Sequence, residues 1–191
     1  MASFQAKGLK HLVLCPGSRS GSLALAAGSL SNFNGLNLIT CIDERSAAFC
    51  ALGIGTATGR AAAVITTSGT AVANLLPAAI EADRSFQPIL FLTADRPKRL
   101  KDCGSNQTVN QEDFLKPVCR AFAQGPSDGI HLFSSNGLDE FVEFSWFNAH
   151  EFPGPVHLNF PIEEPLHASV NDQHYLFKNL SKESLGINEK I

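Results

Sequence analysis

The sequence predicts an α/β fold in which helices flank a parallel sheet on both faces. Short runs rich in β-branched and other apolar residues alternate along the chain with longer alanine-rich runs. The apolar runs, such as AAVITT and PILFLTA, also show no alternation of polar and apolar residues. Unalternated strands are typical of parallel sheets that are covered by helices on both sides.

The composition is that of a core-forming protein rather than a disordered one. The chain has 191 residues, of which 44% are hydrophobic and 17% charged, and this suits one domain. A formal charge of −3 without long charged runs gives no reason to expect nucleic acid or an anionic membrane surface as a partner. No apolar run reaches the roughly 18 residues of a membrane span, and MASFQAKGLKHLVLC lacks the features of a secretory signal.

The cysteines favour a reducing, cytoplasmic location. There are five, they are scattered, and no CxxC pair occurs: Cys15, Cys41, Cys50, Cys103 and Cys119. An odd number without a regular spacing is not typical of a disulfide framework.

The first half of the chain gives the clearest alternation of elements. We expect strands at 11–15, 36–42, 62–67 and 88–94, and helices at 21–30, 44–59 and 71–83. Ser20 or Ser22 could cap the first of these helices, and Gly59 is a natural end for the second. Pro77 should kink the third, because proline lacks an amide donor and crowds the preceding turn.

The second half is less regular. After a polar loop at 96–107 we expect a short helix at 107–118, a strand at 120–124, a helix at 138–150 and a last strand at 155–161. From about residue 169 the sequence is polar and unpatterned. We therefore predict one domain at 1–168, followed by a tail or linker at 169–191.

Polar residues follow the first four predicted strands. They lie in the junctions 16–20, 43–45, 67–70 and 95–96. Since ligands of parallel α/β sheets bind outside the carboxyl ends of the strands, these junctions predict one ligand site.

The residues at the first two junctions leave alternatives open. Ser18, Arg19 and Ser20 suit the binding of a carboxylate or phosphate, but equally a capped helix beside a solvated arginine. Asp43 or Glu44 could be a general acid or base, or an acid that complements the helix dipole. Spacing does not distinguish the two carboxylates.

The third and fourth junctions are similarly ambiguous. The turn formed by Thr67, Ser68, Gly69 and Thr70 matches neither GxxxxGK[ST] nor GxGxxG, and its glycine would admit either an anion or a flat ring. Arg96 could clamp an acidic substrate, whereas a solvated basic loop is the simpler interpretation of Lys98 and Arg99.

The sequence contains no recognised pattern for a metal site or a nucleophilic triad. The six histidines have no HExxH spacing, and no GxSxG elbow accompanies the serines. We therefore assign no metal ligand within this chain.

Taken together, the junctions resemble a known family. The segments CPGSRSGSLALA, DERSAAFCALGIGTATGR, AVITTSGTAVANLLPAAIEADRS and PILFLTADRPKRLKDCGSNQTVNQ look like the N-terminal, pyrimidine-binding domain of thiamine-diphosphate enzymes. Within them, PGSRS, TSGTAVAN and TADRP are most similar to the 2-succinyl-5-enolpyruvyl-6-hydroxy-3-cyclohexene-1-carboxylate synthase family. Acetolactate synthase and related carboligases share the domain but carry other residues at the first and last of these motifs.

The resemblance implies a reaction and a role for each junction. The family decarboxylates 2-oxoglutarate and adds the succinyl unit to isochorismate, in menaquinone or phylloquinone biosynthesis. Glu44 would be the catalytic acid that hydrogen-bonds the aminopyrimidine ring and favours its imino tautomer, and the turn would line the pyrimidine side. The acidic substrates would be bound by Ser18, Arg19, Ser20, Arg96, Asn106 and Gln107.

The resemblance covers only part of such an enzyme. The family binds thiamine diphosphate with Mg²⁺, and its diphosphate-binding domain, with a GDG-to-Asn motif, is missing here. The resemblance thus implies half an active site, completed in a homo-oligomer (a dimer or tetramer), and a fragment that is inactive alone. The alternatives are the pyrimidine domain of another thiamine-diphosphate carboligase or decarboxylase, or a stand-alone interaction module without catalysis.

Overall fold

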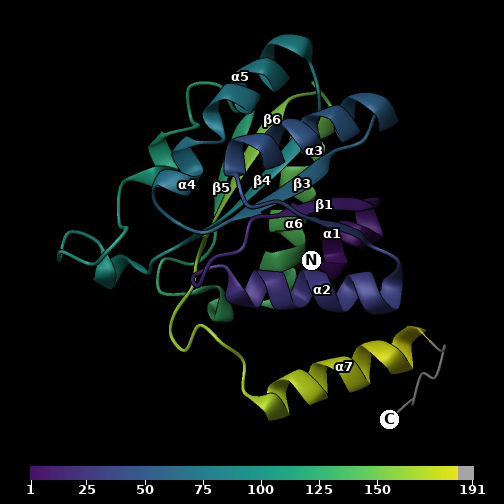
Figure 1. The fold of residues 1–191 in the computed structure, drawn as a ribbon, viewed down its shortest axis with the longest axis vertical. Helices are drawn as coiled ribbons and strands as arrows, with labels where there is room; N and C mark the ends of the chain where they lie inside the picture. The colour runs from purple at the N-terminus through teal and green to yellow at the C-terminus, as the bar shows by residue number, and fades with distance from the viewer. Residues whose placement is uncertain (185–191) are drawn as a thin grey trace.

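A six-stranded, entirely parallel sheet forms the centre of the molecule (Figure 1). The computed structural model describes residues 1–184. The strand order is β2-β1-β3-β4-β6-β5. The strands are β1 His11–Leu14, β2 Asn37–Thr40, β3 Ala62–Thr66, β4 Ile89–Asp95, β5 Ala121–Gln124 and β6 Pro155–Pro161. The predicted parallel α/β fold is therefore confirmed.

Helices cover both faces of the sheet, and they separate into two layers (Figure 1). One face carries α1 (Ala2–Lys7), α2 (Gly21–Asn34) and α6 (Ser135–His150). The other carries α3 (Glu44–Thr58), α4 (Thr70–Ala73) and α5 (Leu76–Ser85). The second helix predicted from the sequence ends as expected, since Gly59 caps α3 in the left-handed conformation with φ of 66°.

The two layers explain why the central strands show no polar alternation. Successive side chains of a strand point to opposite faces. Leu90 packs in the core under α2 and α6, whereas its neighbour Phe91 packs in the core under α3 and α5. Both side chains are fully buried. Each residue of β4 therefore has to be compatible with an apolar or a fully hydrogen-bonded environment.

The edge strand β2 departs from the expectation of a buried strand at 36–42. Ile39 is 40% exposed, and Ile42 lies beyond the strand with 79% of its surface exposed. No strand within the described part of the chain pairs with the outer side of β2. An apolar run alone does not reveal whether a strand lies in the centre or at the edge of its sheet.

Two helix predictions were wrong in detail. The helix expected at 71–83 is divided into α4 and α5, because Pro77 lies in the first turn of α5, where its missing amide donor is not needed. The helix expected at 107–118 is only the short 3₁₀ turn η2 (Gln111–Asp113). Gln107 has a left-handed φ of 56°, which ends any regular structure at the start of that segment.

The segment after residue 169 was expected to be unpatterned, but most of it is helical. Residues Val170–Ser184 form α7, which packs on the outer side of α2, and the rings of Phe33 and Phe177 lie 6.0 Å apart. The last residues of the predicted tail, 185–191, lie outside the described part of the chain. The domain boundary at 168 and the linker role of the segment stay predictions.

Two shorter elements complete the fold. They are the 3₁₀ turns η1 (Lys98–Leu100) and η3 (Ile130–Leu132). Among residues 1–184, no helix is both long enough and apolar enough to cross a membrane.

Candidate functional site

The loops after β1 and β3 meet at the carboxyl edge of the sheet, where the strand order changes direction. A Cβ atom added to Gly17 would lie only 2.5 Å from Cβ of Thr67, so glycine allows the close approach of the two loops. In parallel α/β sheets such a change of direction opens a crevice for ligands. The structure thus brings together the first and third of the predicted junctions.

Arg19 is buried at this edge. The alternative prediction, a capped helix beside a solvated arginine, is therefore wrong for Arg19. Its Nη1 donates to the carbonyl oxygen of Ile162 at 2.9 Å, and its Nη2 lies 3.5 Å from a carboxylate oxygen of Glu164. Its buried Nε has no hydrogen-bond partner among the described residues. Within residues 1–184, Arg19 therefore keeps a buried donor without a hydrogen-bond partner at this edge of the sheet.

The serines beside Arg19 do not cap α2. Ser20 is the N-cap residue and is fully buried, but its hydroxyl donates to the carbonyl oxygen of Gly17 at 3.0 Å rather than accepting from a helix amide. Ser18 is exposed. The buried serine stabilises the loop, and the exposed one faces solvent at the same edge of the sheet.

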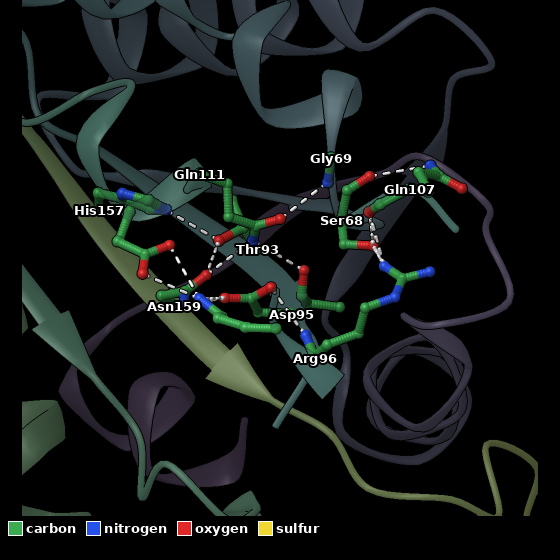
Figure 2. A network of polar contacts seen from close by, with 12 residues as sticks. Ser68, Gly69, Thr93, Asp95, Arg96, Gln107, Gln111, His157 and Asn159 are labelled. Carbon is green, nitrogen blue, oxygen red and sulfur yellow. Dashed lines mark hydrogen bonds and ion pairs between the residues drawn. The ribbon is translucent and has the colours of Figure 1, made fainter. Parts of the chain in front are cut away.

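Arg96, from the end of β4, lies close enough to Arg19 for the two charges to interact. Its Nη1 donates to the hydroxyl of Ser68 and to the carbonyl oxygen of Gln107, the latter at 2.8 Å (Figure 2). Burial lowers the pKa of the Arg96 guanidinium, and the positive charge of Arg19 lowers it further. Two neighbouring guanidinium groups favour an anion between or beside them.

Gln107 closes over the turn after β3. Its Nε2 donates to the carbonyl oxygen of Ser68 at 2.9 Å. Gly69 has φ of 81° and ψ of −134°, and a Cβ atom there would lie 2.7 Å from Cγ of Gln107. Glycine is therefore required at this position for both its conformation and its space.

The buried side-chain amides of Gln111 and Asn159 connect the Ser68-Gly69 turn to Asp95 (Figure 2). Gln111 accepts from the backbone amide of Gly69 at 2.8 Å and donates to Oδ1 of Asn159 at 2.8 Å. Asn159 donates in turn to Asp95 at 2.8 Å, and Asp95 accepts from the backbone amide of Arg96 at 2.7 Å. The third and fourth junctions are thereby connected inside the protein.

The structure separates the two carboxylates that the spacing could not distinguish. Asp43 is the N-cap of α3 and accepts from the amide of Ser46 at 2.7 Å, and this hydrogen bond lowers the pKa of Asp43. Glu44, half-buried at the first position of α3, accepts from Nδ2 of Asn74 at 3.5 Å. Burial, and after it the negative charge of Glu44, raises the pKa of the Cys15 thiol to about 12. Glu44 therefore lies near the end of β1.

Some predicted residues are not joined to this cluster by a side-chain contact. Asn106 and Thr70 are exposed, and Thr67 contributes through its packing beside Gly17. The basic loop is as expected, because Arg99 is exposed and pairs with Glu163, with Nε and Oε2 3.0 Å apart. Asn106, Thr70 and Arg99 thus face solvent at the same edge of the sheet, whereas Thr67 is half-buried.

The sequence did not predict the roles of three buried polar residues, Gln111, Asn159 and His157, or of the half-buried Lys101. Lys101 donates to Asp95 at 2.8 Å and to Glu112 at 2.9 Å. The available signal for Asn159 and His157 was their position inside an otherwise apolar strand, PVHLNFP. Gln111 lies in an irregular polar segment, where nothing in the sequence marks it as buried.

No cluster suited to a metal ion is found in the part of the chain that the structure describes: nowhere in residues 1–184 do three or more His, Cys, Asp or Glu side chains gather as metal ligands.

The sequence of this chain is similar to those of a known enzyme family. Residues 2–116 match the family model described as the thiamine pyrophosphate enzyme, N-terminal TPP binding domain. The 2-succinyl-5-enolpyruvyl-6-hydroxy-3-cyclohexene-1-carboxylate synthase of Prochlorococcus marinus (strain MIT 9313) is 67% identical over 174 residues, which cover 91% of this chain and 30% of that protein. The synthase of the same name from Synechococcus sp. (strain WH7803) is 62% identical over 173 residues, with the same coverage.

The chain spans about 30% of the length of these curated relatives. The match to the family model extends from α1 through the junctions after β1, β2, β3 and β4, and covers more than half of the chain. The chain therefore belongs to the thiamine pyrophosphate enzymes and contains their N-terminal TPP binding domain.

Proposed function

We propose that the full-length protein containing this chain is a thiamine-diphosphate-dependent synthase that decarboxylates 2-oxoglutarate and adds the succinyl unit to isochorismate. Identities of 67% and 62% with relatives that carry the name of this synthase support the proposal. In this function the chain provides the pyrimidine side of the cofactor site and part of the substrate site.

The residues present suit the aminopyrimidine half of the cofactor. Glu44 offers a half-buried carboxylate, and Asp43, which caps the helix, does not compete for that role. Gly69 carries no side chain, and Gln107 fills the side on which a Cβ atom would lie, so a flat ring would pack against the remaining faces of the Ser68-Gly69 turn. We assign Glu44 to a hydrogen bond with the pyrimidine ring, and Thr67, Ser68, Gly69 and Thr70 to the wall beside it.

The arginine pair suits acidic substrates. The buried Nε of Arg19 has no hydrogen-bond partner within residues 1–184, and Arg96 lies within reach of the charge of Arg19. Guanidinium groups bind carboxylates with paired hydrogen bonds, as a dicarboxylic oxo acid and an acidic ring substrate require. We assign Ser18, Arg19, Ser20, Arg96, Asn106 and Gln107 to this side of the site.

Each side contributes a different part of the chemistry. When bound, thiamine diphosphate supplies a carbon nucleophile that takes up the 2-oxo acid and accommodates the charge left by loss of CO₂. Glu44 holds a proton at the pyrimidine ring, Arg19 and Arg96 orient the substrate carboxylates, and Gln107 covers the turn. These residues lie on neighbouring loops of a rigid sheet, which favours a fixed geometry between the two sides.

Further features of the enzyme are part of the same proposal. We propose that Mg²⁺ and the diphosphate are bound outside this chain, that a second subunit completes the site in a homo-oligomer, and that the protein is cytoplasmic. All five cysteines are free, which is compatible with a reducing compartment.

Turnover by the full-length protein tests the proposal. We expect release of CO₂ that depends on 2-oxoglutarate, isochorismate, thiamine diphosphate and Mg²⁺, and none from residues 1–191 alone. Turnover of pyruvate instead of 2-oxoglutarate would show another carboligase or decarboxylase. Absence of turnover with either oxo acid would favour a stand-alone interaction module.

A further inference from the structure

We propose that Gln111 is a positioning residue, which fixes the Ser68-Gly69 turn in register with the Asp95-Arg96 junction through one buried amide. Only the expected effect on turnover rests on the proposed function. The hydrogen bonds on which the inference is built all lie within the described residues. The side chain of Gln111 makes no hydrogen bond to either arginine and is not assigned to substrate or cofactor, so it acts through the groups that it holds.

Gln111 is fully buried, and both polar atoms of its side chain are used. Its Oε1 accepts from the backbone amide of Gly69 at 2.8 Å. Its Nε2 donates to the carbonyl oxygen of Ala94 at 3.0 Å and to Oδ1 of Asn159 at 2.8 Å. Only an amide offers an acceptor on one side and two donors on the other. One side chain therefore connects the turn after β3 with the last residues of β4 and with β6.

The charge of Asp95 sets the direction of every bond in this chain of amides. A buried carboxylate only accepts, so the amide group of Asn159 has to turn its Nδ2 toward Asp95 and its Oδ1 toward Gln111. Gln111 must then present its Nε2 to Asn159, which leaves its Oε1 for Gly69. Oδ1 of the carboxylate accepts from the backbone amide of Arg96, and Lys101 donates to Oδ2, the same oxygen that accepts from Asn159. Because reversing one amide would set two acceptors against each other, the network has one arrangement.

His157 extends the network without adding a titrating group near neutral pH. Thr93 has one hydroxyl proton, which it donates to Asn159 at 2.9 Å, so Nε2 of His157 donates to Thr93 at 2.8 Å. The other ring nitrogen, Nδ1, is buried without a hydrogen-bond partner among the described residues. Thr93 thus bonds to the same oxygen of Asn159 as Gln111 does, but on the side away from the turn.

This arrangement matters because the two halves of the proposed site are attached to its two ends. Gly69, at one end, has a conformation that only glycine adopts readily. Arg96, at the other, has its backbone amide held by Asp95 and its guanidinium bonded back to Ser68 and Gln107. Displacement of the turn relative to Arg96 would separate the cofactor side from the substrate side. A displacement of about 1 Å can cost on the order of 100-fold in rate.

The variant Gln111→Met tests the proposal in the full-length protein, because methionine has a similar size but makes no comparable hydrogen bonds. Thr93→Val is the matched control, since it removes a buried bond to the same oxygen of Asn159 without touching the turn. For Gln111→Met we expect kcat for the synthase reaction to fall about tenfold or more, while KM for 2-oxoglutarate changes by less than about threefold. For Thr93→Val both constants should stay within about twofold of the unmodified protein.

Hydrogen exchange gives a readout that does not depend on turnover. In Gln111→Met the amides of residues 66–72 should exchange at least about tenfold faster, because Gly69 loses its acceptor, and in Thr93→Val they should not. If the unmodified protein shows no synthase activity, the proposed function fails and exchange alone decides the positioning role. Unchanged exchange in Gln111→Met, or equal changes in both variants at equal melting temperature, would overturn the proposal.

Discussion

The guanidinium of Arg19 lies 3.5 Å from the carboxylate of Glu164, a residue 145 positions further along the chain. The two side chains differ in environment, because that of Arg19 is 8% exposed and that of Glu164 is 62% exposed. An acidic ligand that binds Arg19, as proposed above, would share this guanidinium with the exposed carboxylate of Glu164. Glu164 therefore competes with such a ligand for the same charge.

Replacing Glu164 by glutamine should strengthen the binding of acidic substrates. Because an ion pair with one exposed partner contributes about 0–1 kcal/mol, we expect KM for 2-oxoglutarate or isochorismate to fall by up to about fivefold. Steady-state kinetics of the full-length protein measure this effect. Glu163→Gln is the control, since Glu163 pairs with Arg99. An increased KM in Glu164→Gln would show that Glu164 supports binding instead.

Glu44 and Asp43 are adjacent carboxylates for which we expect opposite results. Glu44→Gln should lower kcat of the full-length protein by at least about 100-fold, because an amide cannot exchange a proton with the pyrimidine ring. Asp43→Asn should leave kcat within about threefold, since asparagine also accepts the hydrogen bond from Ser46 and caps α3. Parallel kcat measurements check both variants, and near-normal activity of Glu44→Gln would remove this residue from the mechanism.

Arg96 should not be replaceable by lysine. Nη1 of Arg96 donates to both Ser68 and Gln107, and the ammonium group of lysine lacks the planar fork that also presents a second nitrogen to a carboxylate. We expect Arg96→Lys to raise KM for the acidic substrate about tenfold in steady-state assays of the full-length protein. Arg99→Lys, which keeps a cation opposite Glu163 outside this cluster, should change KM by less than about twofold. Equal effects of the two variants would contradict the assignment.

His157 should make the stability of the fold depend on pH under acidic conditions. Burial lowers the pKa of His157 from 6.5 to about 3, so between these values the unfolded chain binds a proton that the folded chain does not. The free energy of unfolding should therefore fall as the pH drops through this window, with a contribution of up to about 1.4 kcal/mol per pH unit.

Urea unfolding of the protein between pH 4 and pH 7 measures that contribution. The variant His157→Gln keeps a donor for Thr93 but has no titrating ring, so its free energy of unfolding should depend less steeply on pH. His174→Gln, at an exposed position of α7, should keep the slope of the unmodified protein. Identical slopes in all three proteins would show that His157 is not the group responsible.

The sequence predicted the elements whose residues follow a simple rule. The unalternated runs of β3 and β4 required burial on both faces, and Gly59 ended α3 where expected. The failures occurred where burial depends on neighbours that are distant in sequence. Ile39 is partly exposed because β2 lies at the sheet edge, and α7 forms where the sequence looked unpatterned.

The predicted site divides in the same way. The sequence by itself determined the polar junctions and their common edge, because parallel strands place all their carboxyl ends together. Only the tertiary structure decided that Arg19 is buried, that Asp43 is a helix cap, and that Gln111 holds Gly69. The physical reason is that burial and hydrogen-bond partners are set by the elements packed around a side chain. In Gln111 the partners come from the turn after β3, the end of β4 and the middle of β6, which only the fold brings within about 3 Å.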